Sequence, residues 1–256
     1  MKALITGGNS GIGKSMAYYL SNKGYDLIIV GKDKKTLEIV KNNCKTNVKT
    51  YELDLSIVDN VYKLYEKTKK ENIDIIINNA GFGLFGNFID TDLNRELEMI
   101  NVNIVAVHIL TKLFLSDFVK RNSGYILNVA SSAGFMAGPK LSTYYSTKNY
   151  VLRQSLAIYE ELRHMKSNVK ISVLCPGPVN TNFNKVAGGS FIAKSSSSEY
   201  VAKYAIDKMF KNKLIIIPTF SIKTFIFLTR LCPTKLLLKI NYNIQNIKVN
   251  KYNNKK

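Results

Sequence analysis

The stretch Thr6-Gly7-Gly8-Asn9-Ser10-Gly11-Ile12-Gly13 is the strongest indication of the fold, because it joins a short apolar run at the start of the chain to an amphipathic one. Glycines let the chain turn tightly and let its backbone approach a ligand without interference from Cβ atoms. A helix that begins at such a turn directs free N–H groups and a positive dipole toward an anion. The stretch therefore predicts a strand, a turn that binds a phosphate or pyrophosphate, and a helix.

The remainder of the chain continues this alternation of short apolar runs and longer amphipathic runs. Strands that are buried on both faces read as continuous apolar runs, so the alternation predicts a parallel sheet covered by helices on both sides. We expect a single α/β domain of the doubly wound, Rossmann type with about seven strands. The predicted strands are Ala3–Thr6, Leu27–Val30, Val48–Leu53, Ile73–Ile77, Gly124–Ala130, Val169–Leu174 and Leu214–Ile217. The predicted helices are Ile12–Lys23, Lys34–Asn42, Ile57–Lys70, Leu93–Val119, Tyr144–His164 and Glu199–Phe210.

The composition narrows the class of protein. Three widely spaced cysteines indicate neither a disulfide framework nor a metal site, and the chain opens on a strand-like run instead of a signal peptide, so we expect a cytoplasmic protein. The formal net charge is +19. The cations are 32 lysines and 5 arginines, whereas readers of bases and phosphates favour arginine, so no nucleic-acid partner is expected.

Further motifs follow the glycine turn in a fixed order. Asn78-Asn79-Ala80-Gly81 follows the fourth predicted strand, and Pro176-Gly177-Pro178-Val179-Asn180-Thr181 follows the sixth. Between them lie Ser131 and, thirteen residues later, the Tyr144-x-x-x-Lys148 pair. The glycines of the first turn have the spacing G-x-x-x-G-x-G. With these motifs, residues 1–217 resemble the short-chain dehydrogenase/reductase family, in its compact branch of about 250 residues. Within that branch they resemble a bacterial subgroup without an assigned substrate.

The resemblance implies an NAD(P)-dependent oxidoreductase that interconverts a carbonyl and an alcohol by hydride transfer. Its implied catalytic residues are Asn103, Ser131, Tyr144 and Lys148, with Asn103 holding a water on a proton path. Its implied cofactor-binding residues are Thr6, Gly7, Asn9, Ser10, Gly11, Ile12, Gly13, Lys32, Asp54, Leu55, Asn79, Ala80, Gly81, Tyr144, Lys148, Pro176, Gly177, Val179 and Thr181.

The chemistry of two of these residues follows from their spacing. Tyr144 and Lys148 lie four apart on a predicted helix, so they share one face. A free tyrosine has a pKa near 10, and a nearby ammonium group is expected to lower that pKa. Tyr144 is therefore a candidate general acid or base, while Ser131 can donate a hydrogen bond to the substrate oxygen.

The second predicted strand indicates which nicotinamide cofactor is used. In NAD-specific members an acidic residue stands at the position of Gly31, where a carboxylate binds both ribose hydroxyls. The following Lys32 suits a 2′-phosphate, so NADP(H) is expected in preference to NAD(H). The alternative is that Lys32 is an ordinary surface charge.

The substrate is less well indicated. The predicted substrate lid spans about residues 183–198, of which 187–198 is expected to be a mobile loop. An apolar lining is expected from Phe82, Phe135, Met136, Tyr145 and Phe191, which suggests an apolar carbonyl or alcohol. Pairing of the helices that begin near Leu93 and Tyr144, as in the family, would give a homo-oligomer.

Residues 218–256 form a predicted basic and apolar extension. From Lys208 onward the chain has eleven Lys or Arg and no Asp or Glu. The extension either packs on the domain or on another subunit, or it lies on an anionic membrane surface. The alternative functions are therefore a membrane-surface reductase of lipid-like substrates and a nucleotide-binding regulator on the same fold.

Overall fold

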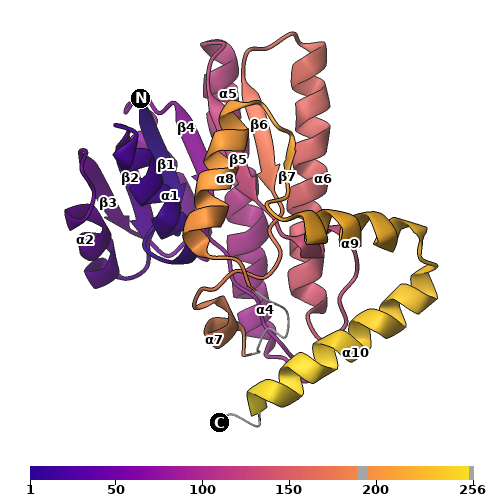
Figure 1. The fold of residues 1–256 in the computed structure, drawn as a ribbon. Helices are drawn as coiled ribbons and strands as arrows, with labels where there is room; N and C mark the ends of the chain where they lie inside the picture. The colour runs from indigo at the N-terminus through magenta and orange to yellow at the C-terminus, as the bar shows by residue number, and fades with distance from the viewer. Residues whose placement is uncertain (189–194, 254–256) are drawn as a thin grey trace.

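The computed structural model describes residues 1–188 and 195–253. Its described residues contain one seven-stranded sheet in which every pairing is parallel and the strand order is β3-β2-β1-β4-β5-β6-β7. The expected Rossmann-type α/β fold is therefore confirmed (Figure 1). The strands are β1 (Lys2–Thr6), β2 (Asp26–Gly31), β3 (Val48–Glu52), β4 (Ile75–Asn78), β5 (Tyr125–Val129), β6 (Lys170–Leu174) and β7 (Ile215–Ile216).

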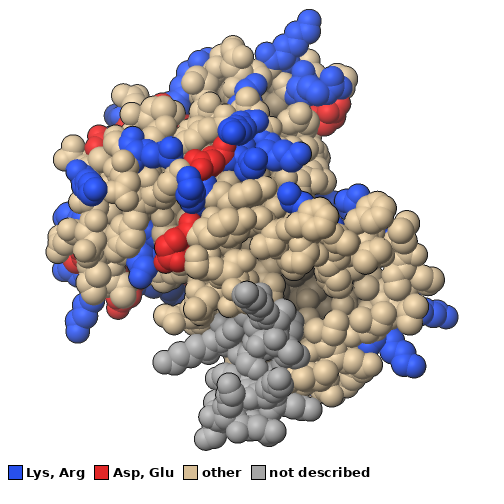
Figure 2. Space-filling view, in the orientation of Figure 1, with Lys and Arg blue, Asp and Glu red and all other residues tan. Residues whose placement is uncertain are grey.

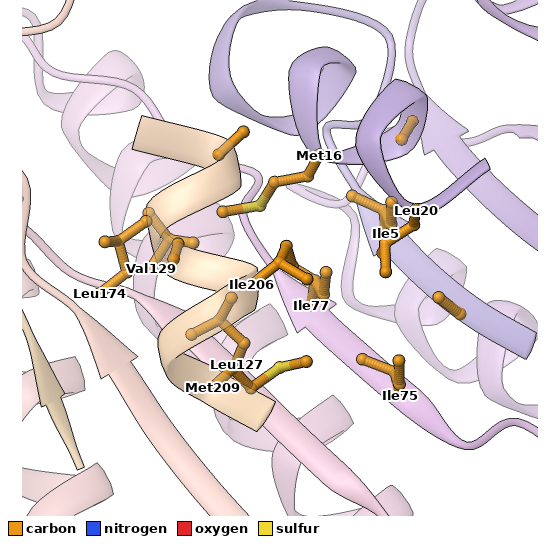
Figure 3. Packing of buried hydrophobic residues seen from close by; sticks show 14 of the residues in the cluster. Ile5, Met16, Leu20, Ile75, Ile77, Leu127, Val129, Leu174, Ile206 and Met209 are labelled. Atoms are coloured by element: carbon orange, nitrogen blue, oxygen red, sulfur yellow. The ribbon is translucent and has the colours of Figure 1, made fainter. Parts of the chain in front are cut away.

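Alternate residues of each strand enter separate cores on the two faces of the sheet. On one face, Ile5 and Ile77 pack under α1 (Gly11–Asn22) and α8 (Ser198–Phe210) (Figure 3). Ile29 and residues of α2 (Lys34–Asn42) belong to the same core. On the other face, Leu4 and Ile76 pack under α3 (Val58–Thr68), α5 (Val107–Lys120) and α6 (Ser142–His164). This division explains why the strands read as continuous apolar runs.

The predicted helix Leu93–Val119 is continuous but contains an irregular turn. It consists of α4 (Leu93–Ile100), a π-helical turn at Asn101–Ala106 and α5. Residues 93–120 are long and apolar enough to span a membrane, but Leu110, Phe114 and Phe118 bury their side chains against the sheet. The apolar character of this helix is thus explained by its place in the core.

The predicted lid begins with the short helix α7 (Phe183–Ala187), and Ser196 forms an isolated bridge with Val179 before α8. Half of the loop expected at residues 187–198, from 189 to 194, lies outside the described residues. After β7 the chain forms α9 (Phe220–Leu231) and α10 (Thr234–Asn253), which we call the C-terminal arm (Figure 1). Cys232 is extended (φ −83°, ψ 130°) because the residue before a proline avoids the helical region, and this separates the two helices.

Candidate active site

The glycine turn after β1 is built to leave room for a ligand. Gly7 and Gly11 have positive φ values of 62° and 51°, and Ser10 is the extended N-cap of α1. A Cβ at Gly13 would lie 2.3 Å from the carbonyl oxygen of Gly7, so a side chain there would disrupt the turn. The side chain of Ser10 makes no cap bond within the described part of the chain, which leaves the first N–H groups of α1 available to an anion.

The turn is held in place by the motif after β4. Thr6 Oγ1 accepts hydrogen bonds from the backbone N–H groups of Asn79 and Ala80, both at 3.0 Å. The Asn79 amide donates in turn to the carbonyl oxygens of Thr6 and Gly7 at 3.0 and 3.1 Å. These reciprocal bonds explain why Thr6 and Asn79 are needed at the ends of neighbouring strands. They fix the backbone on which the predicted phosphate site depends.

Two predicted cofactor residues contact each other at the end of β2. Lys32 Nζ lies 2.7 Å from Asp54 Oδ2. Burial opposes ionisation of Asp54, but its hydrogen bonds with Lys32 and Ser56 outweigh this and lower its pKa. The neighbouring Asp33 caps α2 by accepting the Thr36 N–H at 2.7 Å, and Thr36 Oγ1 accepts from Asn9 at 2.8 Å. Sequence reasoning missed Thr36, which ties the glycine turn to the start of α2.

The structure brings together Ser131, Tyr144 and Lys148 from two elements. Ser131 is the N-cap of a 3₁₀ turn (Ser132–Phe135) that follows β5, and Tyr144 and Lys148 lie one turn apart on α6. The buried Lys148 donates a hydrogen bond to the carbonyl oxygen of Val129 at 2.8 Å, and its Nζ lies 5.9 Å from the centre of the Tyr144 ring. All three side chains line one cavity.

The expected lowering of the Tyr144 pKa is not found. Burial raises the pKa of Tyr144 to about 12, against a smaller opposing effect of its hydrogen bond with Ser131. Burial also lowers the pKa of Lys148 to about 8. The expectation was wrong because withdrawal of the phenol from water is the largest influence on this pKa and outweighs the hydrogen bond with Ser131. At neutral pH Tyr144 is therefore a protonated phenol, which can donate a proton.

Asn103 lies in the π-helical turn and is fully buried. Its amide donates to the Phe82 carbonyl at 2.9 Å and to Thr147 Oγ1 at 3.0 Å, while its Oδ1 accepts the Phe82 N–H at 3.1 Å. The side chain therefore joins the loop after β4 to α6. Its predicted part in a water relay stays a prediction.

The candidate site is one cavity of about 260 Å³ at the carboxyl ends of the strands. Several predicted residues do not line this cavity: Thr6, Gly7, Asn9, Gly13, Lys32, Asp54, Leu55, Ala80 and Asn103. The predicted residues that line it are Ser10, Gly11, Ile12, Asn79, Gly81, Ser131, Tyr144, Lys148, Pro176, Gly177, Val179 and Thr181.

The apolar wall differs in part from the expected one. Phe82 and Tyr145 line the cavity as expected, whereas the ring of Phe135 packs in a core cluster and Met136 is buried outside the cavity lining. Phe191 lies outside the described residues. The wall instead includes four further apolar side chains: Phe85, Leu141, Phe183 and Val186. Of these, Phe183 and Val186 fall within the predicted lid, but no pattern in the sequence distinguished Phe85 or Leu141.

These features agree with the comparisons to known proteins. The sequence pattern of the family described as short chain dehydrogenase matches residues 1–188. Estradiol 17-beta-dehydrogenase 11 of Macaca fascicularis is 32% identical over 250 residues, which cover 94% of this chain and 83% of that protein. The chain therefore belongs to the short-chain dehydrogenase family of oxidoreductases, whose members bind nicotinamide cofactors and act on alcohols or carbonyls.

Two solved structures share the fold. A short-chain dehydrogenase from Sphingobium yanoikuyae in complex with NADPH is 26% identical with a TM-score of 0.80, covering 86% of this chain and 88% of that one. A short-chain dehydrogenase/reductase from Burkholderia phymatum in complex with NAD is 20% identical with a TM-score of 0.78, covering 88% and 91%. The cofactors of these two neighbours differ, so they leave the choice of nicotinamide open.

Proposed function

We propose that this chain is an NADP(H)-dependent oxidoreductase that interconverts an apolar carbonyl and the corresponding alcohol. The observation that carries the proposal is the convergence of Ser131, Tyr144 and Lys148 on the cavity that the glycine turn also borders. We assign residues 1–217 to the catalytic domain and residues 218–256 to an extension. The cytoplasm, or the surface of a membrane facing it, is the proposed location.

The preference for NADP(H) is supported by the charges around the end of β2. The nicotinamide cofactor, when bound, supplies or accepts the hydride. Gly31 has no side chain, so this position provides no carboxylate to bind the two ribose hydroxyls of NAD. The carboxylate of Asp33 is already engaged as the cap of α2. The Lys32 side chain is about half exposed, at 55%, so it can exchange its contact with Asp54 for a 2′-phosphate. The alternative, that Lys32 serves only to pair with Asp54, predicts equal affinity for both nucleotides.

The proposed proton chemistry uses the groups at the cavity in fixed roles. Tyr144, a neutral phenol at neutral pH, protonates the substrate oxygen during reduction, and in the reverse direction its phenolate accepts the proton of the alcohol. Ser131 donates a hydrogen bond to the same oxygen and stabilises the charge that develops there. The ammonium form of Lys148 binds the ribose and lies close enough to the Tyr144 ring to stabilise a transient phenolate.

The proposed substrate class rests on the wall of the cavity. Phe82, Phe85 and Phe183 face it together with the ring of Tyr145, and an apolar pocket with few polar groups suits an apolar ligand. A relative that is named as an estradiol dehydrogenase supports the same class. We propose a bulky apolar ketone or secondary alcohol.

A homo-oligomer is proposed through the outer faces of the long helices. Leu93 and Leu97 of α4 are exposed, and His108 of α5 lies 2.7 Å from the hydroxyl of Tyr150 on α6, at the surface. Pairing of these faces between two copies would cover the exposed leucines. Sedimentation of the purified chain measures the oligomeric state directly.

The proposal is tested with the purified protein in two steps. Titration with NADPH and NADH, followed by nucleotide fluorescence, should show binding of both with tighter binding of NADPH. A screen of apolar ketones should then show oxidation of NADPH that depends on the protein. Binding of neither nucleotide would overturn the proposal, and tighter binding of NADH would overturn the cofactor preference.

A further inference from the structure

The inner side of the C-terminal arm is fixed to the domain near the candidate site. Asn241 donates to the Ala137 carbonyl at 2.9 Å, and Gln245 donates to the Tyr145 hydroxyl at 2.7 Å. Asn246 accepts a hydrogen bond from Lys140 Nζ at 2.7 Å. Ile226 on α9 is also buried. The arm is therefore a fixed layer over the loop before α6, and its polar residues Asn241 and Gln245 are among the most buried on α10.

The outer side of the arm shows the reverse pattern, with large apolar side chains in solvent. On α9, Phe220 is 81% exposed and Leu231 is 69% exposed. Single exposed apolar residues are common on protein surfaces, whereas buried polar residues and large exposed apolar patches are not. Large exposed apolar patches mark interaction sites. The exposed apolar residues of the arm are Phe220, Phe225, Phe227, Leu228, Leu231, Leu236, Leu238, Ile240 and Ile247, while Tyr242, although partly exposed, lies against Lys140 of the domain.

The charges of the arm are all of one sign. Lys223, Arg230, Lys235 and Lys239 are exposed, and the chain has no acidic residue from Lys208 onward. No ion pair found among the described residues includes a cation of the arm. Figure 2 shows blue and tan atoms over the visible part of the arm, without red ones. Lys223 and Arg230 lie over the rings of Tyr204 and Phe135, so these contacts leave their charges without an anionic neighbour in the described part of the chain.

We propose that the C-terminal arm docks on an anionic lipid surface, with the exposed apolar residues at the acyl boundary and the lysines at the headgroups. Helices with Phe and Leu beside Lys and Arg lie in such interfaces, and each cation near an anionic surface adds to the attraction. A second copy of the arm fits less well, because its cations would repel those of the first. This docking specifies how the chain would reach the membrane surface given above as a proposed location, and it needs neither nucleotide nor turnover.

The docking is tested by sedimentation of the full chain with vesicles, without nucleotide or substrate. Vesicles of phosphatidylcholine mixed with phosphatidylglycerol should bind the protein, those of phosphatidylcholine alone should bind it at least about tenfold more weakly, and added salt should weaken the binding. One variant combines Phe227→Ser, Leu228→Ser and Leu231→Ser, and a second combines Lys235→Glu and Lys239→Glu. Each should lower the affinity at least about tenfold, since these side chains are exposed and contribute to the docking face.

A matched control reverses two exposed cations on another helix. Lys63→Glu with Lys67→Glu on α3 changes the net charge by the same amount as the arm variant and should bind vesicles nearly as well as the wild type. Thermal unfolding verifies that each variant is folded. Equal binding to both kinds of vesicle, or arm variants that bind like the wild type, would overturn the proposal. The proposal would also be overturned if the chain bound no vesicles and formed a dimer that the serine substitutions abolish, because a second copy of the chain would then cover the exposed apolar face. Nucleotide binding, measured separately, shows whether the proposed function stands.

Discussion

Gln245 of α10 donates a hydrogen bond to the hydroxyl of Tyr145, which lies next to Tyr144 in the chain. The Tyr145 ring lines the candidate cavity and meets the Tyr144 ring edge to face, with centroids 6.2 Å apart. Gln245 is 2% exposed, although it lies 100 residues further along the chain. The C-terminal arm therefore sets the position of one wall of the candidate site.

Replacing Gln245 with leucine should raise the KM for an apolar ketone about fivefold, because one buried hydrogen bond contributes about 1 kcal/mol. The kcat and the Kd for NADPH should change by less than about twofold, since Gln245 is a positioning residue. In a double-mutant cycle, adding Tyr145→Phe to Gln245→Leu should raise the KM for the ketone little further. Additive losses, or an equal fall in kcat, would show that the bond to Tyr145 is not what Gln245 contributes.

Tyr144→Phe should lower kcat by about 10²–10⁴-fold, because the phenol is the proposed proton donor and phenylalanine has no proton to give. The Kd for NADPH should stay within about twofold of the wild-type value. Tyr159→Phe, at a partly exposed position on the same helix, is the matched control and should keep full activity. Turnover that survives in Tyr144→Phe would contradict the assignment of the donor.

Lys32→Ala should weaken the binding of NADPH at least about tenfold and leave the binding of NADH within about twofold, because a charged hydrogen bond is worth about 1.5–3 kcal/mol. Lys41→Ala, at the other end of α2, removes an exposed lysine that pairs with Glu38 and should alter neither affinity. Equal losses for the two nucleotides in Lys32→Ala would exclude a role at the 2′-phosphate. Titration by nucleotide fluorescence measures both constants.

The kcat/KM for NADPH should fall as the pH rises through about 8. Burial lowers the pKa of Lys148 to about 8, so the ammonium form is complete well below that pH and is lost above it. A cation that binds the ribose is useful only while charged, and this kinetic ratio reports groups of the free enzyme. A profile that stays flat to pH 10 would mean that Lys148 titrates at its ordinary value or takes no part in binding.

Glu71→Gln should lower the midpoint of thermal unfolding by about 2–4 °C at pH 7. Glu71 pairs with Lys2 at 2.7 Å and with Lys49, and these bonds lower its pKa from 4.5 to about 2. The folded state therefore favours the carboxylate, and this stability is complete above about pH 4.5 and lost as the pH falls toward 2. Melting curves should show a smaller difference between the midpoints of the wild type and Glu71→Gln at pH 3 than at pH 7. The control Glu66→Gln, with an exposed partner in Lys69, should change the midpoint by less than about 1 °C at either pH.

Much of the fold was predictable because its signals are local. Buried parallel strands must be apolar on both faces, so runs such as Ile75–Ile77 identified their own strands within a few residues. The irregular turn at Asn101–Ala106 was not predictable, since a π-helical turn leaves the apolar pattern of a long helix unchanged.

The candidate site was predictable where each motif follows a strand. Parallel strands bring their carboxyl ends to one edge of the sheet, which is why Ser131 and Thr181 line the same cavity. The apolar wall was less predictable, because Phe135 and Phe85 are equally apolar in the sequence and only packing sends one to a core cluster and the other to the cavity.

Local sequence patterns were enough to predict the succession of strands and helices along the chain, the glycine turn and the spacing of Tyr144 and Lys148, because each depends on residues close together in the chain. Long-range packing determines that burial raises the pKa of Tyr144 and lowers that of Lys148, since both shifts depend on how much water reaches each group. It also decided which face of the arm is covered. The domain presents the carbonyl of Ala137 and the hydroxyl of Tyr145 to α10. Asn241 and Gln245 therefore face inward, and leucines of the same helix remain in solvent.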